Sequence, residues 1–278
     1  MTTETQTPGI NFTRDEGEAG LAVLASLGDA NYQLPTLTDE EIVALDGIAN
    51  EQAVTLPWLD QYPEQRELLC NVALRTLLTK GLAFPVIPEG ESQATKLGAI
   101  EPITGVMFLR RMSQRIVITE LTKGEGEKVW LYSYVHGDVV LQELVDSVGS
   151  HSFSVVSLQD TATVIMELAN AAGIESSDGP VDVLTPEEFE VKAAQSLSDV
   201  LGVTIITAIG AGDEQSSHYT LYTSANTLNG LEAEEVDGSV KLHVAQVSAQ
   251  SARAKVAAVV QGGGVAENSA QDSSGEGN

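Results

Sequence analysis

The hydrophobic pattern between residues 38 and 112 predicts three helices. Thr38 and Glu41 have the spacing of a capping box, and apolar residues recur after them with the period of a helix. A second helix is expected over 64–80, because a proline precedes it and Gly81 suits the left-handed position after a helix. Apolar residues at helical spacing place a third helix over 97–112.

A pattern of strands and turns then occurs twice. Residues 116–160 can be laid over residues 205–249 without a gap. Each copy starts with a β-branched run and continues through an acidic, glycine-bearing turn, an aromatic strand, a third strand and a helix. Strands joined by short turns pair antiparallel. The expected fold class is therefore α+β, an antiparallel sheet built from two pseudo-symmetric strand–strand–strand–helix halves with flanking helical bundles.

Further helices are expected around these copies. Thr185 is followed by a proline and two glutamates, which is a helix-start pattern, and the helix is predicted to run to about Leu201. The helices that close the two copies are predicted at about 159–172 and 249–260, and a short helix at 20–27.

The connection between the second and third strands of the first copy is unusually apolar, whereas its counterpart at 228–237 is acidic. Two interpretations are open. The segment is an additional strand or helical turn in the core, or it is an exposed apolar loop, and exposed apolar patches often mark partner sites. Under the second interpretation the partner-binding residues are Val139, Val140, Leu141, Leu144 and Val145.

The domain organisation follows from these patterns. The two halves span about 38–173 and 185–260, with a linker between them that contains glycine and proline, and we expect one domain over 21–260. Residues 1–20 and 261–278 hold few apolar groups. We expect both to be disordered, because they cannot bury enough surface to offset the entropy lost on ordering.

Composition narrows the choice of partners. The 278 residues include 40 acidic and 14 basic side chains, a formal net charge of −26. Such a field repels both nucleic-acid phosphates and anionic membrane surfaces, so we expect no nucleic-acid partner. Residues 1–8 lack the basic and apolar regions of a signal peptide, and no apolar run is long enough to span a membrane. We therefore expect a cytoplasmic protein without membrane insertion.

Candidate chemistry is sparse. The histidines at 136, 151, 218 and 243 are scattered along the sequence, and Cys70 is the single cysteine, so we expect no intrachain disulfide and no metal site. Surface or half-buried positions are expected for the histidines and a core position for the thiol. Runs of adjacent acids are typical of solvated helix starts, and no phosphate-loop, dinucleotide or hydrolase motif is present. We expect no catalytic residues and no cofactor. An uncatalogued enzyme remains an alternative, which a dry pocket with convergent His and Glu would favour.

A winged-helix regulator is the other alternative. Helices 64–80 and 97–112 would be followed by the hairpin 116–135 as the wing, and Arg110 and Arg111 lie beside it. A DNA-binding helix in so acidic a chain needs many cations. Helix 64–80 has only three, and glutamates offset two of them, so this interpretation is the weaker one.

Two short motifs resemble the EspG family, the cytosolic chaperones of actinobacterial ESX (type VII) secretion. Residues 37–45 read Leu-Thr-Asp-Glu-Glu-Ile-Val-Ala-Leu and resemble the family's Leu-Thr-x-x-Glu helix start. Residues 73–82 end in Leu-Thr-Lys-Gly-Leu and resemble its Leu-x-x-x-Gly-Leu helix end. The duplicated halves are similar to its pseudo-two-fold fold. The resemblance covers roughly 34–260; residues 1–33 and the acidic tail depart from it.

The resemblance implies a non-catalytic chaperone or adaptor. Its client would be a secreted protein of the PPE-like or WXG type, whose apolar tip it would keep soluble. Family members bind through the sheet, the connection between the second and third strands and the C-terminal helices. In this chain those regions are about 137–149, 185–201 and 248–260.

Overall fold

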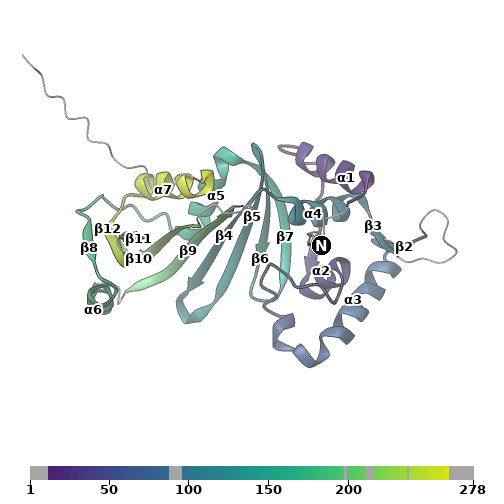
Figure 1. The fold of residues 1–278 in the computed structure, drawn as a ribbon, viewed down its shortest axis with the longest axis horizontal. Coiled ribbons are helices and arrows are strands. Elements are labelled where there is room, and N and C mark those ends of the chain that lie inside the picture. Colours follow the sequence, from purple (N-terminus) through teal and green to yellow (C-terminus); the bar gives the residue numbers. More distant parts are fainter. Residues whose placement is uncertain (1–11, 88–95, 197–198, 211–215, 237, 263–278) are drawn as a thin grey trace, which may run out of the picture.

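One long antiparallel sheet runs through the molecule (Figure 1). The computed structural model describes residues 12–87, 96–196, 199–210, 216–236 and 238–262. Within them, ten strands pair in the order β1-β7-β6-β5-β4-β9-β10-β11-β12-β8. Their bounds are β1 Thr36–Thr38, β4 Arg115–Lys123, β5 Lys128–His136, β6 Val139–Val145, β7 Ser150–Ser157, β8 Asp182–Leu184, β9 Val200–Gly210, β10 Ser217–Ser224, β11 Leu228–Val236 and β12 Ser239–Gln246.

The strand order reads the same from both edges of the sheet. β4 and β9 pair in the middle, β5 to β7 and β10 to β12 follow on either side, and the short strands β1 and β8 close the edges. Ile118 pairs with Thr207, and these residues also hold equal positions in the two overlaid copies, so the two-fold relation passes between them. A helix follows each set of strands: α5 (Leu158–Ala169) and α7 (Ala249–Gln261). The expected α+β class is confirmed.

Each repeated copy has four strands rather than three, and in the first copy the apolar connection is itself the strand β6. It pairs with β5 along its whole length and with β7 on its other side. Helices cover both faces of the sheet at this position. A strand buried on both faces has a nearly continuous apolar run instead of an alternating one. The interpretation as an additional core strand is confirmed.

The gapless overlay of the two copies is wrong for the second strand. Tyr134 pairs with Ile116, and Thr220 pairs with Ile205, so Tyr134 and Thr220 are structural counterparts. The overlay matches Tyr134 with Thr223 instead. The chain between the paired positions is shorter in the second hairpin, so the overlay shifts the second strand by an odd number of residues. Such a shift exchanges the two faces of the strand, and the overlay therefore assigns the side chains of β10 to the wrong faces.

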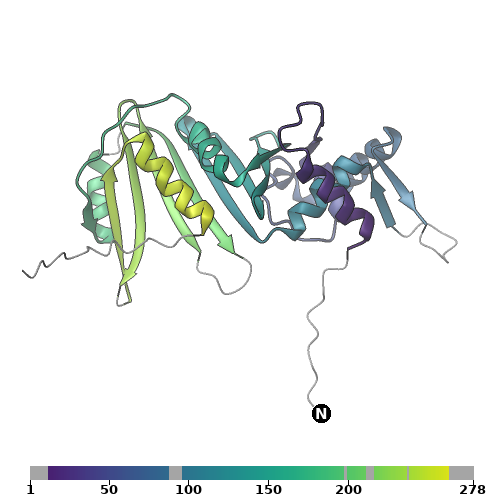
Figure 2. The same ribbon diagram turned by 90° about the horizontal axis from the view of Figure 1, so that it is seen from above.

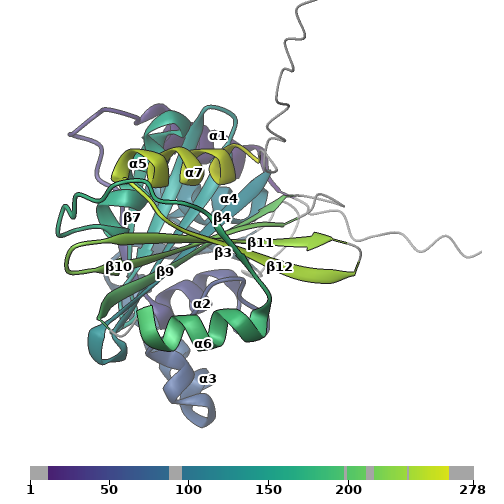
Figure 3. The ribbon, with the colours of Figure 1, turned by 90° about the vertical axis from the view of Figure 1, so that its left-hand side faces the viewer.

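The helices lie on both faces of the sheet. α5 and α7 lie together on one face, where their apolar residues pack on β4, β9 and β10 (Figures 2 and 3). On the opposite face, α2 (Asp39–Asp46) lies under the first half and α6 (Pro186–Ser196) under the second. Both follow a short edge strand, and both start at the predicted threonine. Thr38 forms the predicted capping box with Glu41, and Thr185 forms one with Glu188.

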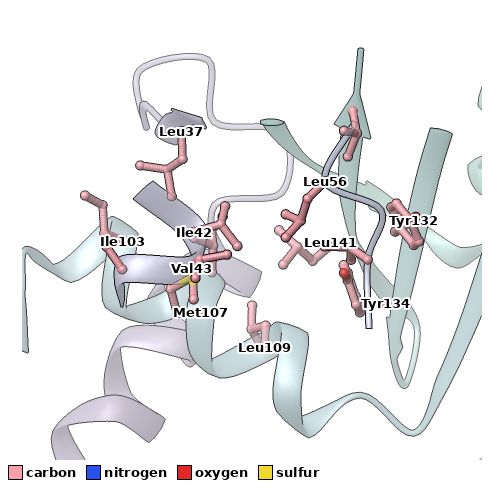
Figure 4. Close-up of a cluster of buried hydrophobic side chains, with 14 of the residues drawn as sticks. Leu37, Ile42, Val43, Leu56, Ile103, Met107, Leu109, Tyr132, Tyr134 and Leu141 are labelled. Carbon is pink, nitrogen blue, oxygen red and sulfur yellow. The ribbon is translucent and has the colours of Figure 1, made fainter. Parts of the chain in front are cut away.

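An additional helical layer completes the core under the first half only. It consists of the 3-10 turns η1 (Leu59–Gln61) and η2 (Pro63–Gln65), the helices α3 (Arg66–Thr79) and α4 (Glu101–Met112), and a separate hairpin of β2 (Ala83–Val86) and β3 (Lys96–Ala99). Figure 4 shows Met107 of α4 beside Val43 of α2, and Leu56 facing Leu141 of β6. Cys70 lies in this core, as expected.

Two predicted boundaries in this region are corrected. The helix expected over 97–112 begins only at Glu101, because the preceding residues form β3; Pro102 lies in its first turn and does not interrupt it. The helix expected at 20–27 is α1, which spans Arg14–Ala25. Thr13 and Glu16 form a capping box that starts it early. Residues 14–20 are therefore ordered, contrary to the prediction, while residues 1–11 lie outside the described part of the chain.

Two predicted boundaries in the second half are also corrected. α6 is described as far as Ser196, and β9 starts at Val200, so the predicted helix end at Leu201 is too late. Gln261 is still helical and Gly262 has the left-handed conformation with φ 75°, so these two residues do not belong to a disordered tail. The rest of the predicted tail, 263–278, lies outside the described residues. In the part of the chain described, no helix has the length and apolarity needed to cross a membrane.

Candidate functional site

A cluster of charged side chains is buried under the first half of the sheet. His151 on β7 lies between Asp39, the first residue of α2, and Glu143 on β6. Its Nε2 is 2.8 Å from Asp39 Oδ1, and its Nδ1 is 2.6 Å from Glu143 Oε1. Glu143 Oε2 also accepts hydrogen bonds from Arg110 Nε at 2.9 Å and from the Tyr134 hydroxyl at 2.6 Å. Asp39, Glu143 and His151 are fully buried.

The charges in this cluster balance one another. Carboxylates only accept hydrogen bonds, so both ring nitrogens of His151 donate and the ring is positively charged. Burial alone would lower the pKa of His151, but its hydrogen bonds to Asp39 and Glu143 outweigh burial and raise it. Burial would raise the pKa of Glu143, but the charge of Arg110 and the bond to His151 lower it to about 2. Two cations thus face two anions, as burial requires.

The cluster joins several elements of the first half. Asp39 Oδ2 accepts the backbone N–H groups of Trp58 and Leu59 at 2.8 and 2.9 Å. The cluster thereby fixes α2, α4, β6, β7 and the chain around Trp58 to one another. A general base needs a free lone pair, and neither ring nitrogen of His151 has one. The arrangement therefore serves to hold the fold together, and it does not have the accessible pocket that the enzyme alternative would need.

The other histidines are closer to expectation. His136 is partly buried and lies 3.1 Å from the backbone oxygen of Leu109. His218 and His243 lie at exposed or half-buried positions on β10 and β12. The fully buried position of His151 is therefore the one that the sequence did not predict. Among the described residues, no group of three or more His, Cys, Asp or Glu side chains has the geometry of a metal site.

The five residues predicted to bind a partner lie on β6, and most of them are inaccessible. Val140, Leu141 and Val145 are fully buried, and Val139 is half-buried. Leu144 alone is exposed, at 39%. The segment is therefore core, and it does not offer the continuous apolar surface that the loop interpretation requires.

An accessible apolar surface lies instead in the middle of the sheet, on the face opposite α5 and α7. Along β9 every second residue is buried under those helices, and the residues between them point the other way. Of these, Leu201, Ile205 and Ile209 are 55%, 44% and 48% exposed. Ile116 and Ile118 of the paired strand β4 lie on the same face of the sheet, but they are half-buried against the core of the first half. We call the exposed row of Leu201, Ile205 and Ile209 on β9 the open face.

Two rims border the open face (Figure 1). On one side α6 lies under β10 and β12, and the ring of Phe189 approaches that of Tyr222, with centroids 6.4 Å apart. Residues of α6, β11 and β12 line a largely apolar cavity of about 260 Å³ between them. On the other side, the chain between α2 and α3 is tied to β5, because the Tyr132 hydroxyl accepts the backbone N–H of Thr55 at 2.8 Å.

The sequence indicates the open face only when the apolar pattern of β9 is compared with the length of chain that precedes it. The run from Val203 to Ile209 is apolar on both faces, as in a strand covered on both sides. However, the second half has only a few residues between α6 and β9, too few to build a second cover. An apolar strand without enough chain to cover it indicates an exposed apolar surface.

The chain is similar to known proteins in its structure, although no family model or curated protein matches its sequence. Among solved structures, the chain is similar to EspG5, the type VII secretion system chaperone of Mycobacterium tuberculosis, whose structure was determined in complex with the PE25–PPE41 dimer. The TM-score is 0.53 and the identity 11%, over 82% of this chain and 95% of that chain. At this identity the likeness concerns the fold: the chain has the fold of the EspG family, which its sequence motifs resemble.

Proposed function

We propose that this chain is a chaperone of a type VII secretion system that binds a PPE-like or WXG-type protein and keeps its apolar tip soluble. The observation that supports this most is the uncovered apolar row on β9, in the middle of a sheet with the EspG fold. EspG5, which has the same fold, was solved with a PE25–PPE41 dimer bound. In this proposal the protein acts in the cytoplasm and performs no catalytic step.

The physical basis is the burial of apolar surface by both partners. A row of exposed aliphatic side chains on a rigid sheet is unfavourable in water, and a client that covers it gains the hydrophobic contribution on both sides. The sheet is held by paired strands and the two helices behind it, so little conformational entropy is lost when a client docks. The net charge of −26 keeps the pair soluble once the apolar tip is covered.

The three regions implied by the family resemblance differ in how well they fit this surface. Region 185–201 contains α6 and the start of β9, and it borders the open face. Region 137–149 is mostly the buried strand β6, although Val148 in the following turn is exposed. Region 248–260 is α7, which lies on the opposite face of the sheet. We therefore favour 185–201 together with β9 as the client contact.

Co-expression with proteins encoded by neighbouring genes tests the proposal. The wild-type chain should co-elute with a PPE-like or WXG-type neighbour in size-exclusion chromatography. Replacing Ile205 and Ile209 by Asp should weaken the complex at least about tenfold, because two charges would be buried against apolar surface. Leu21→Asp is the matched control, since Leu21 is 67% exposed on α1, remote from the open face.

Thermal unfolding of each variant separates loss of binding from loss of fold. Ile205 and Ile209 are exposed, so the double variant should stay folded, with an unfolding temperature lowered only moderately by the new carboxylate opposite Glu120. Failure of every neighbouring PPE-like and WXG-type protein to co-elute would refute the proposal. A complex that tolerates the double substitution would show that the client contacts another surface.

A further inference from the structure

The open face on β9 is uncovered, whereas the equivalent surface of β4 in the first half is covered by other parts of the chain. Ile116 on β4 and Ile205 on β9 hold equivalent positions about the central pair. Ile116 packs against the core of the first half, whereas Ile205 is 44% exposed. In the first half, residues 47–112 lie between α2 and β4 and supply the cover. In the second half β9 follows α6 almost directly, so the chain has nothing equivalent to offer.

The first half shows what such a cover consists of. Leu56 is buried against the sheet between α2 and β5 (Figure 4). The flanking backbone is held by polar groups, through Thr55 on the Tyr132 hydroxyl and through the backbone N–H groups of Trp58 and Leu59 on Asp39. In this cover, an apolar side chain therefore faces the sheet, and the backbone N–H groups on either side of it donate hydrogen bonds to side-chain oxygens.

The margins of the open face carry mostly negative charge. α6 has the exposed carboxylates of Glu187, Glu188 and Glu190 against a single cation, Lys192, which already pairs with Asp182. The chain that forms the other rim carries three further exposed acids, Glu51, Asp60 and Glu64. Of these, Asp60 is paired with Arg66. Both rims therefore attract cations.

We propose that the segment that covers the open face has apolar residues directed at β9 and basic residues on its flanks. This inference rests on the proposed chaperone function and names the client chemistry that the surface selects. A second copy of the chain is a poor occupant, because each copy carries a net charge of −26 and the two would repel one another. A basic flank gains from the field of both rims, chiefly in the rate of association.

Two synthetic peptides provide the first test. Both have the same amphipathic apolar pattern, and they differ only in carrying lysines or glutamates on the flanks. With the full-length chain, fluorescence anisotropy should give an affinity at least about tenfold higher for the lysine peptide, and added salt should reduce the difference. Ile205→Asp should abolish binding of the lysine peptide, which separates docking on the open face from general attraction to an acidic protein.

A pair of matched charge variants locates the effect. Replacing Glu187 and Glu190 by Gln should weaken binding of the lysine peptide several-fold. The control replaces Glu167 and Glu175 by Gln; it changes the net charge equally, and both residues are exposed away from the open face. Equal weakening by both pairs, or equal affinity for the two peptides, would overturn the inference.

The outcomes also distinguish this inference from the proposed function. Suppose that Ile205→Asp releases a co-expressed client but that replacing Glu187 and Glu190 by Gln does not weaken client binding. The chaperone proposal then stands and the inference about basic flanks fails. If no neighbouring PPE-like protein binds but the lysine peptide docks and is sensitive to Ile205→Asp, the surface chemistry stands and the partner belongs to another class. A dimer in solution that Ile205→Asp dissociates would identify a second copy as the occupant and overturn the inference.

Discussion

His151 connects several elements of the first half. Its two ring nitrogens bind carboxylates from α2 and β6, and one of these, Glu143, also binds Arg110 of α4. In the second half Val240 takes the equivalent position in the sheet, and no helical layer is attached there. The cluster is thus specific to the half with the additional layer, and it fixes the orientation of that layer on the sheet.

Replacing His151 by Gln tests how much this cluster contributes. The variant leaves two buried carboxylates facing one cation, so the free energy of unfolding should fall by about 3–5 kcal/mol, as when one member of a buried ion pair is removed. Urea denaturation monitored by tryptophan fluorescence measures it. The control is His243→Gln, because the pair of His243 with Glu234 is partly exposed and contributes about 0–1 kcal/mol. Equal losses in the two variants would contradict the buried-cluster account.

The same cluster makes stability depend on pH, with a sign that follows from its pKa values. The pKa of His151 is raised in the folded state, so its contribution is complete below the ordinary value of 6.5 and is lost as the pH rises through the folded pKa. The pKa of Glu143 falls from 4.5 to about 2, so its contribution is complete above 4.5 and is lost as the pH falls towards 2. Stability should therefore be greatest between these two ordinary values.

Urea midpoints measured across this range check the prediction. The wild-type midpoint should decline above pH 6.5, and the decline should be smaller in His151→Gln. Comparison of these two proteins removes the contribution of His136, whose pKa is lowered by burial and whose effect has the opposite sign. A parallel decline in both proteins would show that another group titrates.

At the scale of elements, α1 is held on α4 by a close approach of the two backbones. A Cβ atom added at Gly105 of α4 would lie 2.5 Å from the backbone oxygen of Ala19. A backbone atom cannot turn aside as a side chain does, so only glycine allows this crossing. Capping explains why α1 begins at Arg14. The close approach at Gly105 explains how α1 can pack tightly against α4.

Gly105→Ala should therefore displace α1. We expect a loss of about 1–3 kcal/mol in stability from overpacking, and faster amide hydrogen exchange over Arg14–Ala25. Gly17→Ala is the matched control, because a Cβ there meets no atom within 4 Å, and alanine favours the helix by about 0.5–1 kcal/mol. Exchange in α1 that is unchanged by Gly105→Ala would mean that the helix can shift without cost.

Elements were predictable where local chemistry decides them. The capping boxes at Thr38 and Thr185 mark the starts of α2 and α6, because the cap and its partner lie three residues apart in the sequence. Segment 139–145 could not be assigned from its own residues, since its burial on both faces depends on helices elsewhere in the chain. The cluster around His151 was not predictable for the same reason: Asp39 is 112 positions away, and only strand pairing brings the two together.

At the scale of the whole molecule, the two halves share a frame and differ in what covers it. The turn and strand patterns of the sequence predicted an antiparallel sheet with two related halves, but they did not predict the edge strands β1 and β8. The cover is not symmetric, because residues 47–112 have no counterpart. The open face arises from that difference. The sequence shows it only when strand apolarity is compared with the length of chain that remains to cover each strand.

The excess of acidic residues gives a prediction for the molecule as a whole. The chain has forty acidic and fourteen basic side chains, and its excess negative charges repel one another more in the compact state than in the unfolded chain. Raising NaCl from about 20 to about 200 mM shortens the range of this repulsion to below about 10 Å and should raise the unfolding temperature. The same rise should appear in Ile205→Asp, because the repulsion is spread over the surface. A fall in unfolding temperature with salt would instead mean that exposed pairs, such as Lys128 with Glu120 and Lys255 with Glu232, outweigh the general repulsion.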